Sequence, residues 1–361
     1  MRVLHVIARL NIGGTARYIT RLAEELPTHK VEIFVATGFV QGSEEEDPSV
    51  KKINLLRIPS LGRQFNPIKD HCARKQLLAL IQDVKPDIVH THTFKAGLIG
   101  RIRTKEINHA AGKQVKFVHT FHGHLFEDPE FSGFKSFVIR AFESHLAKRT
   151  DAIVTVGRQV ASELLELKIG QPKQFITIAP GVEPLKLPKA KQHKKVTVGW
   201  IARVTGVKNP LRALEIAKLF PASQFLIAGG GDMLEEVKAK APKNTKVLGW
   251  TDASNLFAAS DIILSTSENE GMPIALIEAQ LARKPVVATN VGSVAEVVIN
   301  NKTGFITGKN TADLAKALEK LINSKALRMA QGKAANAHAT KAFSVEKMVK
   351  AHVSLYKKLA K

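Results

Sequence analysis

The chain has 361 residues, of which 44% are hydrophobic and 24% are charged. This composition is typical of soluble globular proteins, and at about 150 residues per domain the length predicts two domains. The one cysteine, Cys72, excludes an internal disulfide and a cysteine-rich zinc site, and it fits a reducing cytoplasm. The formal net charge of +22 is compatible with nucleic acid, an anionic membrane or a phosphorylated substrate as partner.

The positive charge is spread over the second half of the chain and does not form a tail. Residues 184–361 carry 28 basic and 13 acidic side chains (+15), whereas residues 1–183 carry 26 and 19 (+7). Aromatic residues make up only 6% and do not interleave with a basic stripe, which argues against nucleic acid. No run approaches the roughly 20 apolar residues of a membrane span, so we expect a cytoplasmic protein.

Short apolar runs rich in Val, Ile and Phe alternate with segments of helical period in the first half of the chain. Because these runs lack polar alternation, they predict strands buried on both faces of a parallel sheet. In chain order the expected strands are Val3–Ala8, Val31–Thr37, Leu55–Pro59, Asp87–Thr91, Val115–Thr120, Ala152–Val156 and Phe175–Ala179. Helical patterns cover Thr15–Leu26 and Pro67–Val84.

A stretch rich in lysine and proline, residues 184–195, predicts a linker between two domains. The sequence therefore predicts an α/β fold with two Rossmann-like domains, residues 1–183 and 196–342, followed by a terminal helix in residues 343–361. Ligands of such sheets bind beyond the carboxyl ends of the strands, so we expect the site in a cleft between the domains. The expected strands of the second domain are Val196–Ile201, Gln224–Ala228, Lys246–Leu248, Asp261–Ser265, Pro285–Thr289 and Gly304–Ile306.

Gly13 and Gly14 follow the first expected strand and open a helix. A Gly-Gly turn lets backbone N–H groups approach an anion at a helix N-terminus, but it equally suits a tight connection between strand and helix. The pattern is not G-x-G-x-x-G, and no acidic residue ends the second expected strand, so the sequence does not favour a dinucleotide.

His122 lies in the segment HTFHGH at the end of the fifth expected strand. On a strand it would share a face with Thr120 and His124, and His90 and His92 end the neighbouring strand. Three interpretations remain open, namely contact with a substrate hydroxyl, a structural role and a metal site. The metal interpretation lacks a cysteine or carboxylate at a recognisable spacing.

Two cations follow the first expected strand of the second domain. Arg203 comes directly after it, and Lys208 precedes a helix that opens at Asn209. An arginine binds phosphate oxygens bidentately and a lysine acts as a point charge, so the two suit a diphosphate; the alternative is a pair of solvated surface charges. The glycine run around Gly230 follows the next strand and by itself indicates a turn.

The most specific pattern is EGMPIALIEA, in which Glu278 follows Glu270 by eight residues. Pro273 suits the first turn of a helix, and Glu278 lies among apolar residues of that helix. A buried carboxylate needs hydrogen-bond partners, and sugar hydroxyls supply them. The alternative is an acid favoured by the helix dipole together with a second acid on an amphipathic face.

Taken together, these segments resemble the family 4 glycosyltransferases over nearly the whole chain. That family has the GT-B fold, in which two Rossmann-like domains face each other across a cleft. The Glu270…Glu278 pattern is specific, the glycine pairs are not, and the HTFHGH segment is similar to bacterial transferases that build cell-surface polysaccharides. Asn209 and Ser293 stand where Gly is common in the family.

The resemblance implies a retaining transfer of a hexosyl or N-acetylhexosaminyl group from a nucleotide sugar, with UDP favoured, to a hydroxyl of a glycan or lipid-linked acceptor. It implies no cofactor, because Arg203 and Lys208 would hold the diphosphate in place of a metal ion. Glu278 would bind the ribose, Glu270 the transferred sugar, and His122 that sugar near its reacting carbon. The implied donor-binding residues are Gly13, Gly14, Arg203, Lys208, Gly230, Glu270, Gly271, Met272, Pro273 and Glu278.

The resemblance also implies that the terminal helix returns to the first domain. A nucleotide-sugar epimerase on the same scaffold is the alternative function. An anionic membrane is a further partner to consider, with a peripheral position on the inner face of the membrane. Four phenylalanines after the HTFHGH segment suit either such an apolar face or helix packing, namely Phe126, Phe131, Phe134 and Phe137.

Overall fold

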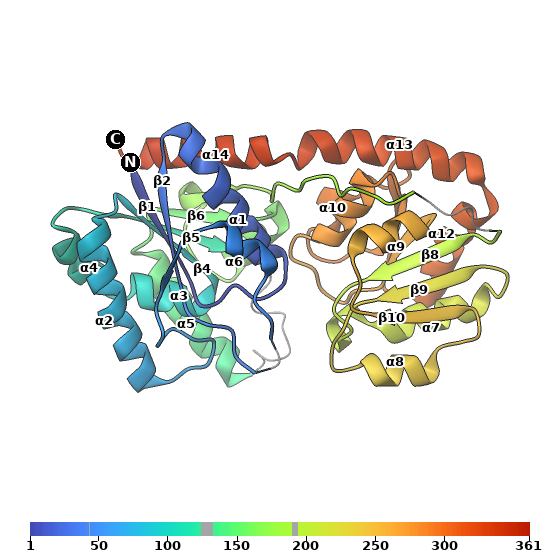
Figure 1. The fold of residues 1–361 in the computed structure, drawn as a ribbon, viewed down its shortest axis with the longest axis horizontal. Coiled ribbons are helices and arrows are strands. Elements are labelled where there is room, and N and C mark those ends of the chain that lie inside the picture. Colours follow the sequence, from blue (N-terminus) through green and yellow to red (C-terminus); the bar gives the residue numbers. More distant parts are fainter. Residues whose placement is uncertain (43, 124–132, 190–193) are drawn as a thin grey trace. The chain divides into compact units, whose positions relative to one another are not determined.

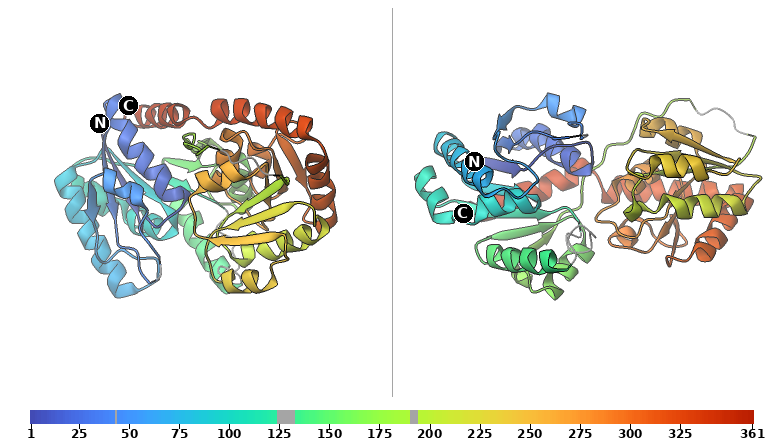
Figure 2. Two further views of the ribbon diagram at one scale, coloured as in Figure 1. Left: turned by 45° about the vertical axis from the view of Figure 1, so that its right-hand side comes forward. Right: turned by 90° about the horizontal axis from the view of Figure 1, so that it is seen from below.

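The computed structural model describes residues 1–361 except 43, 124–132 and 190–193. The chain divides into two compact units, one made of Met1–Gly181 with Val345–Lys361 and the other of Val182–Ser344. Each unit is a parallel sheet with helices on both faces (Figures 1 and 2). The second unit begins two residues before the linker that the sequence predicts at residues 184–195.

The sheet of the first unit has seven strands in the order β3-β2-β1-β4-β5-β6-β7, all parallel. The strands are β1 (Arg2–Ile7), β2 (Glu32–Thr37), β3 (Leu55–Arg57), β4 (Ile88–His92), β5 (Lys116–Phe121), β6 (Ala152–Thr155) and β7 (Phe175–Thr177). The helices are α1 (Gly14–Glu25), α2 (Pro67–Val84), α3 (Thr93–Arg101), α4 (Thr104–Ala111), α5 (Phe134–Ala147), α6 (Arg158–Glu166) and α14 (Val345–Leu359).

The sheet of the second unit has six parallel strands in the order β10-β9-β8-β11-β12-β13. They are β8 (Thr197–Ile201), β9 (Gln224–Ala228), β10 (Thr245–Gly249), β11 (Ile262–Ser265), β12 (Val286–Thr289) and β13 (Gly304–Thr307). The helices are α7 (Pro210–Leu219), α8 (Leu234–Lys240), α9 (Ala253–Ala259), α10 (Ile274–Leu281), α11 (Val294–Val297), α12 (Thr311–Asn323) and α13 (Lys325–Ala342).

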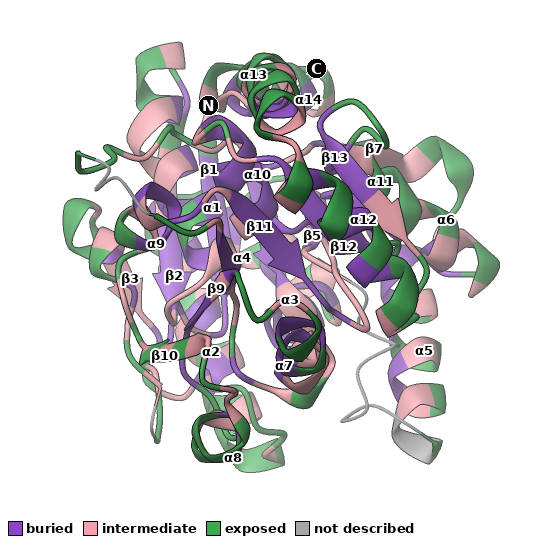
Figure 3. Ribbon diagram, turned by 90° about the vertical axis from the view of Figure 1, so that its right-hand side faces the viewer, coloured by how far each residue is buried: buried purple, intermediate pink, exposed green. Residues whose placement is uncertain are grey.

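All thirteen segments expected as strands contain a strand, and the predicted parallel sheets are confirmed. The central strands are buried along their length, as the purple β11 and β12 in Figure 3 show. Full burial is a wrong expectation for the four edge strands β3, β7, β10 and β13, each of which has half-buried or exposed residues. Each of them has one neighbour in its sheet, so its outer side is not covered by a further strand.

The last helix, α14, packs in the first unit although the whole second unit precedes it in the sequence. It contributes five residues to the same apolar core as α1 and β1, namely Met348, Val349, Val353, Leu355 and Tyr356. Figure 1 shows it beside α1. The first unit is therefore completed by the C-terminal end of the chain.

Candidate functional site

Lys208 and Glu270 form an ion pair in the second unit. Lys208 ends a short 3-10 turn, Gly206–Lys208, that follows β8, and its Nζ lies 2.7 Å from Glu270 Oε2. The Ser267 hydroxyl donates to the other carboxylate oxygen, Oε1, at 2.7 Å. Both oxygens of Glu270 are thus engaged, in a loop that follows β11. The structure brings together two residues that the sequence assigned to different parts of a donor molecule.

Asn209 connects the loop after β8 to the loop after β11 through a side-chain hydrogen bond. Its side chain accepts from the Arg212 backbone N–H, which caps α7, and donates to Glu268 Oε1 at 2.8 Å. Arg212 also donates to Glu268 Oε1, at 2.6 Å. Partial burial opposes ionisation of Glu268, but these hydrogen bonds outweigh it and hold its pKa below the ordinary value.

The backbone of Asn209 explains why it stands at a position where the family often has Gly. Its φ of 46° and ψ of 61° lie in the left-handed region, which Asn tolerates better than most residues other than Gly. The departure from the family pattern therefore keeps the turn and adds a helix cap.

Glu278 lies in α10, where it is 6% exposed. The turn before this helix contains Gly271, Met272 and Pro273, and the Gly271 carbonyl accepts from the Ser293 N–H at 3.2 Å. The turn thus rests on the segment just before α11. The burial of Glu278 agrees with the expectation of a carboxylate inside an apolar helix.

The glycines after β9 allow a close approach of two loops. A Cβ on Gly229 would lie 1.8 Å from the Ala202 carbonyl oxygen, and one on Gly230 would lie 2.1 Å from Trp250 Nε1. The Gly230 carbonyl accepts from the Val204 N–H at 2.9 Å. These contacts fix the backbone on both sides of Arg203.

Trp250 is a residue that the sequence analysis missed. It follows β10, lies against Gly230, and is 67% exposed. A Gly-Trp pair directly after a strand is the signal that sequence inspection could have used. An exposed indole beside a glycine turn is a flat apolar surface for a planar ring.

Arg203 is exposed, and among the described residues its guanidinium has no ion pair or hydrogen bond. It lies two residues after the end of β8, and Lys208 lies five residues further along the chain. Its charge is accessible to an anion, whereas that of Lys208 is shared with Glu270. Joint binding of a diphosphate by the two cations stays a prediction.

In the first unit, the turn before α1 is tied down by a carboxylate. Gly13 adopts φ 154° as the N-cap of α1, and its N–H donates to Asp47 Oδ2 at 3.4 Å. Asp47 is buried and also accepts from Ser49. One backbone donor near Gly14 is therefore already satisfied, and the sequence analysis did not identify Asp47.

His122 follows β5, is half-buried, and contacts a group of buried imidazoles. Its Nε2 lies 2.9 Å from His92 Nδ1, and His92 Nε2 lies 2.9 Å from His5 Nδ1. Burial is the main cause that lowers the pKa of His122 and of His5 to about 3, and the charge of His352 lowers both further. These rings are neutral at pH 7.

Among the described residues, His5, His90 and His92 form one cluster whose ligand nitrogens lie within 4.8 Å of one another. The rings of His90 and His92 stack, with centroids 4.3 Å apart and planes at 25°. Zinc needs nitrogens that converge on one point at about 2.0–2.1 Å. The cluster is arranged as a stack of hydrogen-bonded rings and not as converging ligands. His124 lies outside the described residues.

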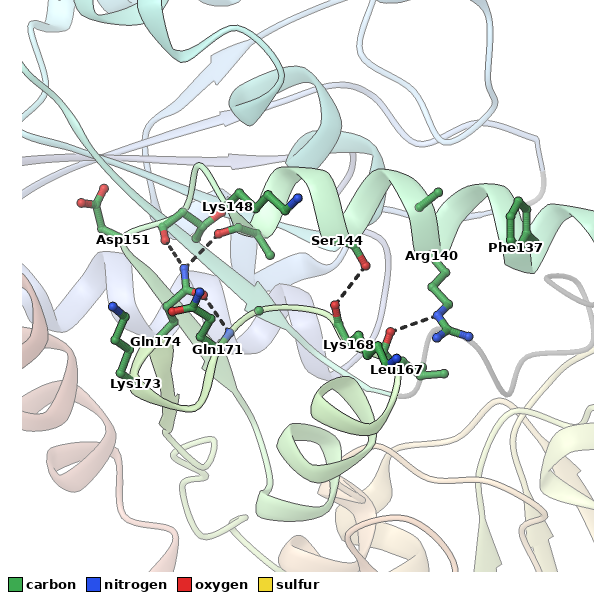
Figure 4. A pocket seen from close by; sticks show the side chains of 14 residues that line it. Phe137, Arg140, Ser144, Lys148, Asp151, Leu167, Lys168, Gln171, Lys173 and Gln174 are labelled. Carbon is green, nitrogen blue, oxygen red and sulfur yellow. Dashed lines mark hydrogen bonds between the residues drawn. The ribbon is translucent and has the colours of Figure 1, made fainter.

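A separate pocket of about 830 Å³ lies in the first unit between α5 and the segment that connects α6 to β7 (Figure 4). It contains none of the predicted site residues. Phe137, which is 68% exposed, lies at one end of the pocket. Four cationic residues also line it, namely Arg140, Lys148, Lys168 and Lys173.

Of the other phenylalanines in the predicted apolar face, Phe126 and Phe131 lie outside the described residues, as does the side chain of Phe134. Within the part of the chain that the structure describes, no helix has the length and apolar character needed to cross a membrane.

Two family models match the chain and together cover most of it. The model described as Glycosyltransferase Family 4 matches residues 12–184, and the model described as Glycosyl transferases group 1 matches residues 183–338. Among curated proteins, the chain is 28% identical to UDP-Gal:alpha-D-GlcNAc-diphosphoundecaprenol alpha-1,3-galactosyltransferase of Escherichia coli, with 91% of this chain and 90% of that protein covered.

Two solved structures share the fold at 17% sequence identity. Sucrose-phosphate synthase from Thermosynechococcus elongatus matches with a TM-score of 0.84 over 99% of each chain. HepE from Anabaena, in complex with UDP and glucose, matches with a TM-score of 0.81 over 99% of this chain and 100% of its own. These likenesses extend through both units.

Proposed function

Because this chain is a glycosyltransferase of family 4 with the GT-B fold, we propose that it takes its sugar from a UDP-linked donor. The group that moves is a hexosyl or N-acetylhexosaminyl group, and the acceptor is a hydroxyl of a glycan or of a lipid-linked saccharide. The activity named for the Escherichia coli relative supports this choice, since it specifies UDP, a galactosyl group and a diphosphoundecaprenol-linked acceptor.

The ion pair of Lys208 and Glu270 is the observation that carries the proposal. A sugar–diphosphate bond has anionic oxygens on one side and sugar hydroxyls on the other. A cation suits the first and a carboxylate suits the second, and here the two lie 2.7 Å apart. The exposed guanidinium of Arg203, in the same loop, supplies a second cation for the phosphates.

The proposed reaction retains the configuration at the anomeric carbon. The acceptor oxygen forms a bond to that carbon on the face from which UDP departs, and the bond between the carbon and the phosphate oxygen breaks. The acceptor proton passes to the departing phosphate. Arg203 and Lys208 stabilise the charge that develops on UDP, so that no divalent cation is required.

The remaining donor contacts are part of the same proposal. Glu278 accepts hydrogen bonds from the ribose hydroxyls, and the uracil stacks on the exposed indole of Trp250 beside Gly230. His122 contacts the transferred sugar. Gly13 and Gly14 shape the surface near the phosphates or the acceptor.

Peripheral binding to the inner face of a membrane completes the proposal. The pocket on α5 combines an exposed apolar ring, Phe137, with cations such as Arg140 and Lys148, which suits anionic lipid. Sedimentation with vesicles tests this part. Phe137→Ser is expected to reduce binding to anionic vesicles, whereas equal binding of wild type to neutral and anionic vesicles would exclude it.

A thermal-shift panel of UDP-, GDP- and ADP-sugars tests the donor, since a ligand that binds the native state raises the melting temperature. UDP-sugars are expected to give the largest shift. A larger shift with GDP- or ADP-sugars would refute the choice of nucleotide. Incubation with the donor alone serves as a second test, because formation of an epimeric sugar would favour an epimerase.

A further inference from the structure

An unbroken hydrogen-bonded chain runs through the interior of the first unit to His122. It is built from β1, β4, β5 and α14, which meet there because His5 pairs with His90 in the register of the two central strands. In order it links Thr120, His90, Tyr356, His5, His92 and His122, with separations of 2.6, 2.6, 3.2, 2.9 and 2.9 Å.

Each imidazole of this chain has one donor and one acceptor nitrogen. Burial, and next the charges of neighbouring histidines, lower the pKa of His90 and His92 well below the ordinary value, so the rings stay neutral. Both nitrogens of His5, His90 and His92 are used within the chain. The direction of donation at one ring therefore fixes the direction at the next.

Thr120, at the buried end of the series, determines the direction of donation. Thr120 is fully buried, and His90 Nε2 is the partner that its hydroxyl has among the described residues. A buried hydroxyl proton without an acceptor is costly, so Thr120 donates to His90. His90 then carries its proton on Nδ1 and donates to Tyr356, and the same order continues outward.

We propose that this series of hydrogen bonds, in which the Tyr356 hydroxyl of α14 connects His90 to His5, holds His122 in the tautomer with the proton on Nδ1. His122 then accepts from His92 at Nε2 and presents an N–H donor on the other side of its ring. Under the function proposed above, that donor binds an oxygen of the transferred sugar, and His122 does not act as a base. Tyr356 and the inner histidines are positioning residues.

A second hydrogen-bonded contact of α14 lies beside His122 but outside this series of hydrogen bonds. His352 Nδ1 lies 2.9 Å from the Met348 carbonyl, which can only accept, so His352 carries its proton on Nδ1. Its Nε2 therefore accepts from the Tyr18 hydroxyl at 3.0 Å. The Tyr18 ring packs edge-on against His122, with centroids 5.1 Å apart and planes at 87°. Tyr18 thus contacts His122 without belonging to the chain, and it provides a matched control.

Side-chain 15N NMR of histidine-labelled protein at pH 7 tests the proposal, because the two tautomers have distinct 15N shifts. The wild type is expected to show the Nδ1–H tautomer at His5, His90, His92 and His122. Tyr356→Phe removes the hydroxyl that accepts a hydrogen bond from His90 and donates one to His5. The donor and acceptor roles of His5 are then no longer determined by His90, so His122 should show a mixture of tautomers. Tyr18→Phe also removes a buried phenol hydroxyl but should keep the wild-type signal.

Turnover provides a second readout if the proposed transfer is observed. Tyr356→Phe is then expected to lower kcat roughly five- to tenfold, the effect of losing one oriented hydrogen bond. An Nε2–H signal at His122 in the wild type would overturn the proposal, as would equal disturbance by Tyr356→Phe and Tyr18→Phe. The NMR result does not depend on turnover, so a failure of the proposed function is recognised separately.

Discussion

Lys208 Nζ lies 2.7 Å from Glu270 Oε2, and the Ser267 hydroxyl completes the partners of that carboxylate. The pair joins the loop after β8 to the loop after β11, which are neighbouring strands of one sheet. A cation and an acid from separate segments thus meet at the carboxyl end of the sheet, where ligands of α/β proteins bind.

Replacement of Lys208 tests the importance of that pair. Lys208→Ala is expected to lower the kcat of sugar transfer by roughly 10²–10³-fold, because a preorganised charge near the leaving group is lost. Glu270→Gln should also reduce transfer strongly. Steady-state kinetics with the purified protein measures both effects.

Lys309→Ala is the matched control for Lys208→Ala. Lys309 also pairs with a glutamate of the second unit, Glu268, at 3.3 Å, but its side chain is half exposed. Its replacement should change kcat by less than about twofold, since exposed ion pairs contribute little. Equal losses in the two variants would mean that the pair at Glu270 has no special role.

Trp250 is expected to stack on the base of the donor. Trp250→Ala should weaken UDP binding by roughly fivefold or more, since stacking of a base on an aromatic ring contributes about 1–3 kcal/mol. Binding of UDP should also quench the fluorescence of Trp250. The other tryptophan, Trp200, is buried and donates to the Thr266 hydroxyl, so it should not respond. If Trp250→Ala binds UDP with the affinity of the wild type, the base does not stack on Trp250.

Two replacements of Asn209 separate what its left-handed backbone and its helix cap each contribute to the free energy of unfolding. Asn209→Ala should lower the free energy of unfolding by about 1–2 kcal/mol, because it loses the cap of α7 and leaves a Cβ in left-handed backbone. Asn209→Gly should cost less, since Gly adopts that conformation freely. Urea unfolding of the three proteins measures the difference, and a Gly variant less stable than the Ala variant would contradict this account.

Acid should destabilise the protein below about pH 6.5. The pKa of His5 and His122 is lowered to about 3, and that of His352 to about 4, mainly by burial. In the unfolded chain these histidines bind protons with a pKa of about 6.5, whereas in the folded protein they stay neutral until a much lower pH. The contribution of these histidines to the free energy of unfolding is therefore fully present above about pH 6.5. It falls by about 1.4 kcal/mol per pH unit per histidine as the pH is lowered toward the pKa of the folded state.

Urea unfolding at pH 7, 6 and 5 measures this slope. His352→Gln removes one such group and should make the pH dependence shallower between pH 6 and 5. His109→Gln, at an exposed position of α4, is the control and should leave the slope as it is. Equal stability of the wild type at pH 7 and pH 5 would show that these histidines are not held neutral.

Local patterns were sufficient to predict the strands, because most of the buried strands are dominated by apolar residues, and the bounds of α2 follow from its helical period. The burial of Glu278 was equally predictable from its apolar neighbours. The contact of Lys208 with Glu270 was not, because it depends on how loops 62 residues apart meet.

The histidine cluster could be predicted only in part. His90, His92 and His122 follow from the strand pattern, but His5 joins them through the register of β1 against β4, which no local pattern specifies. Tyr356 is still more distant, since the helix that carries it is separated from β1 by the whole second unit. Non-local pairing is thus what the sequence analysis lacked.

Transfer in the presence of EDTA, followed by NMR of the product, tests the central claim most directly. The donor is the UDP-sugar with the largest thermal shift, and the acceptor is a lipid-linked diphosphate saccharide. We predict an α-linked product from an α-linked donor, formed without divalent cation and lost in Lys208→Ala. A β-linked product, or transfer that requires added magnesium, would contradict the account.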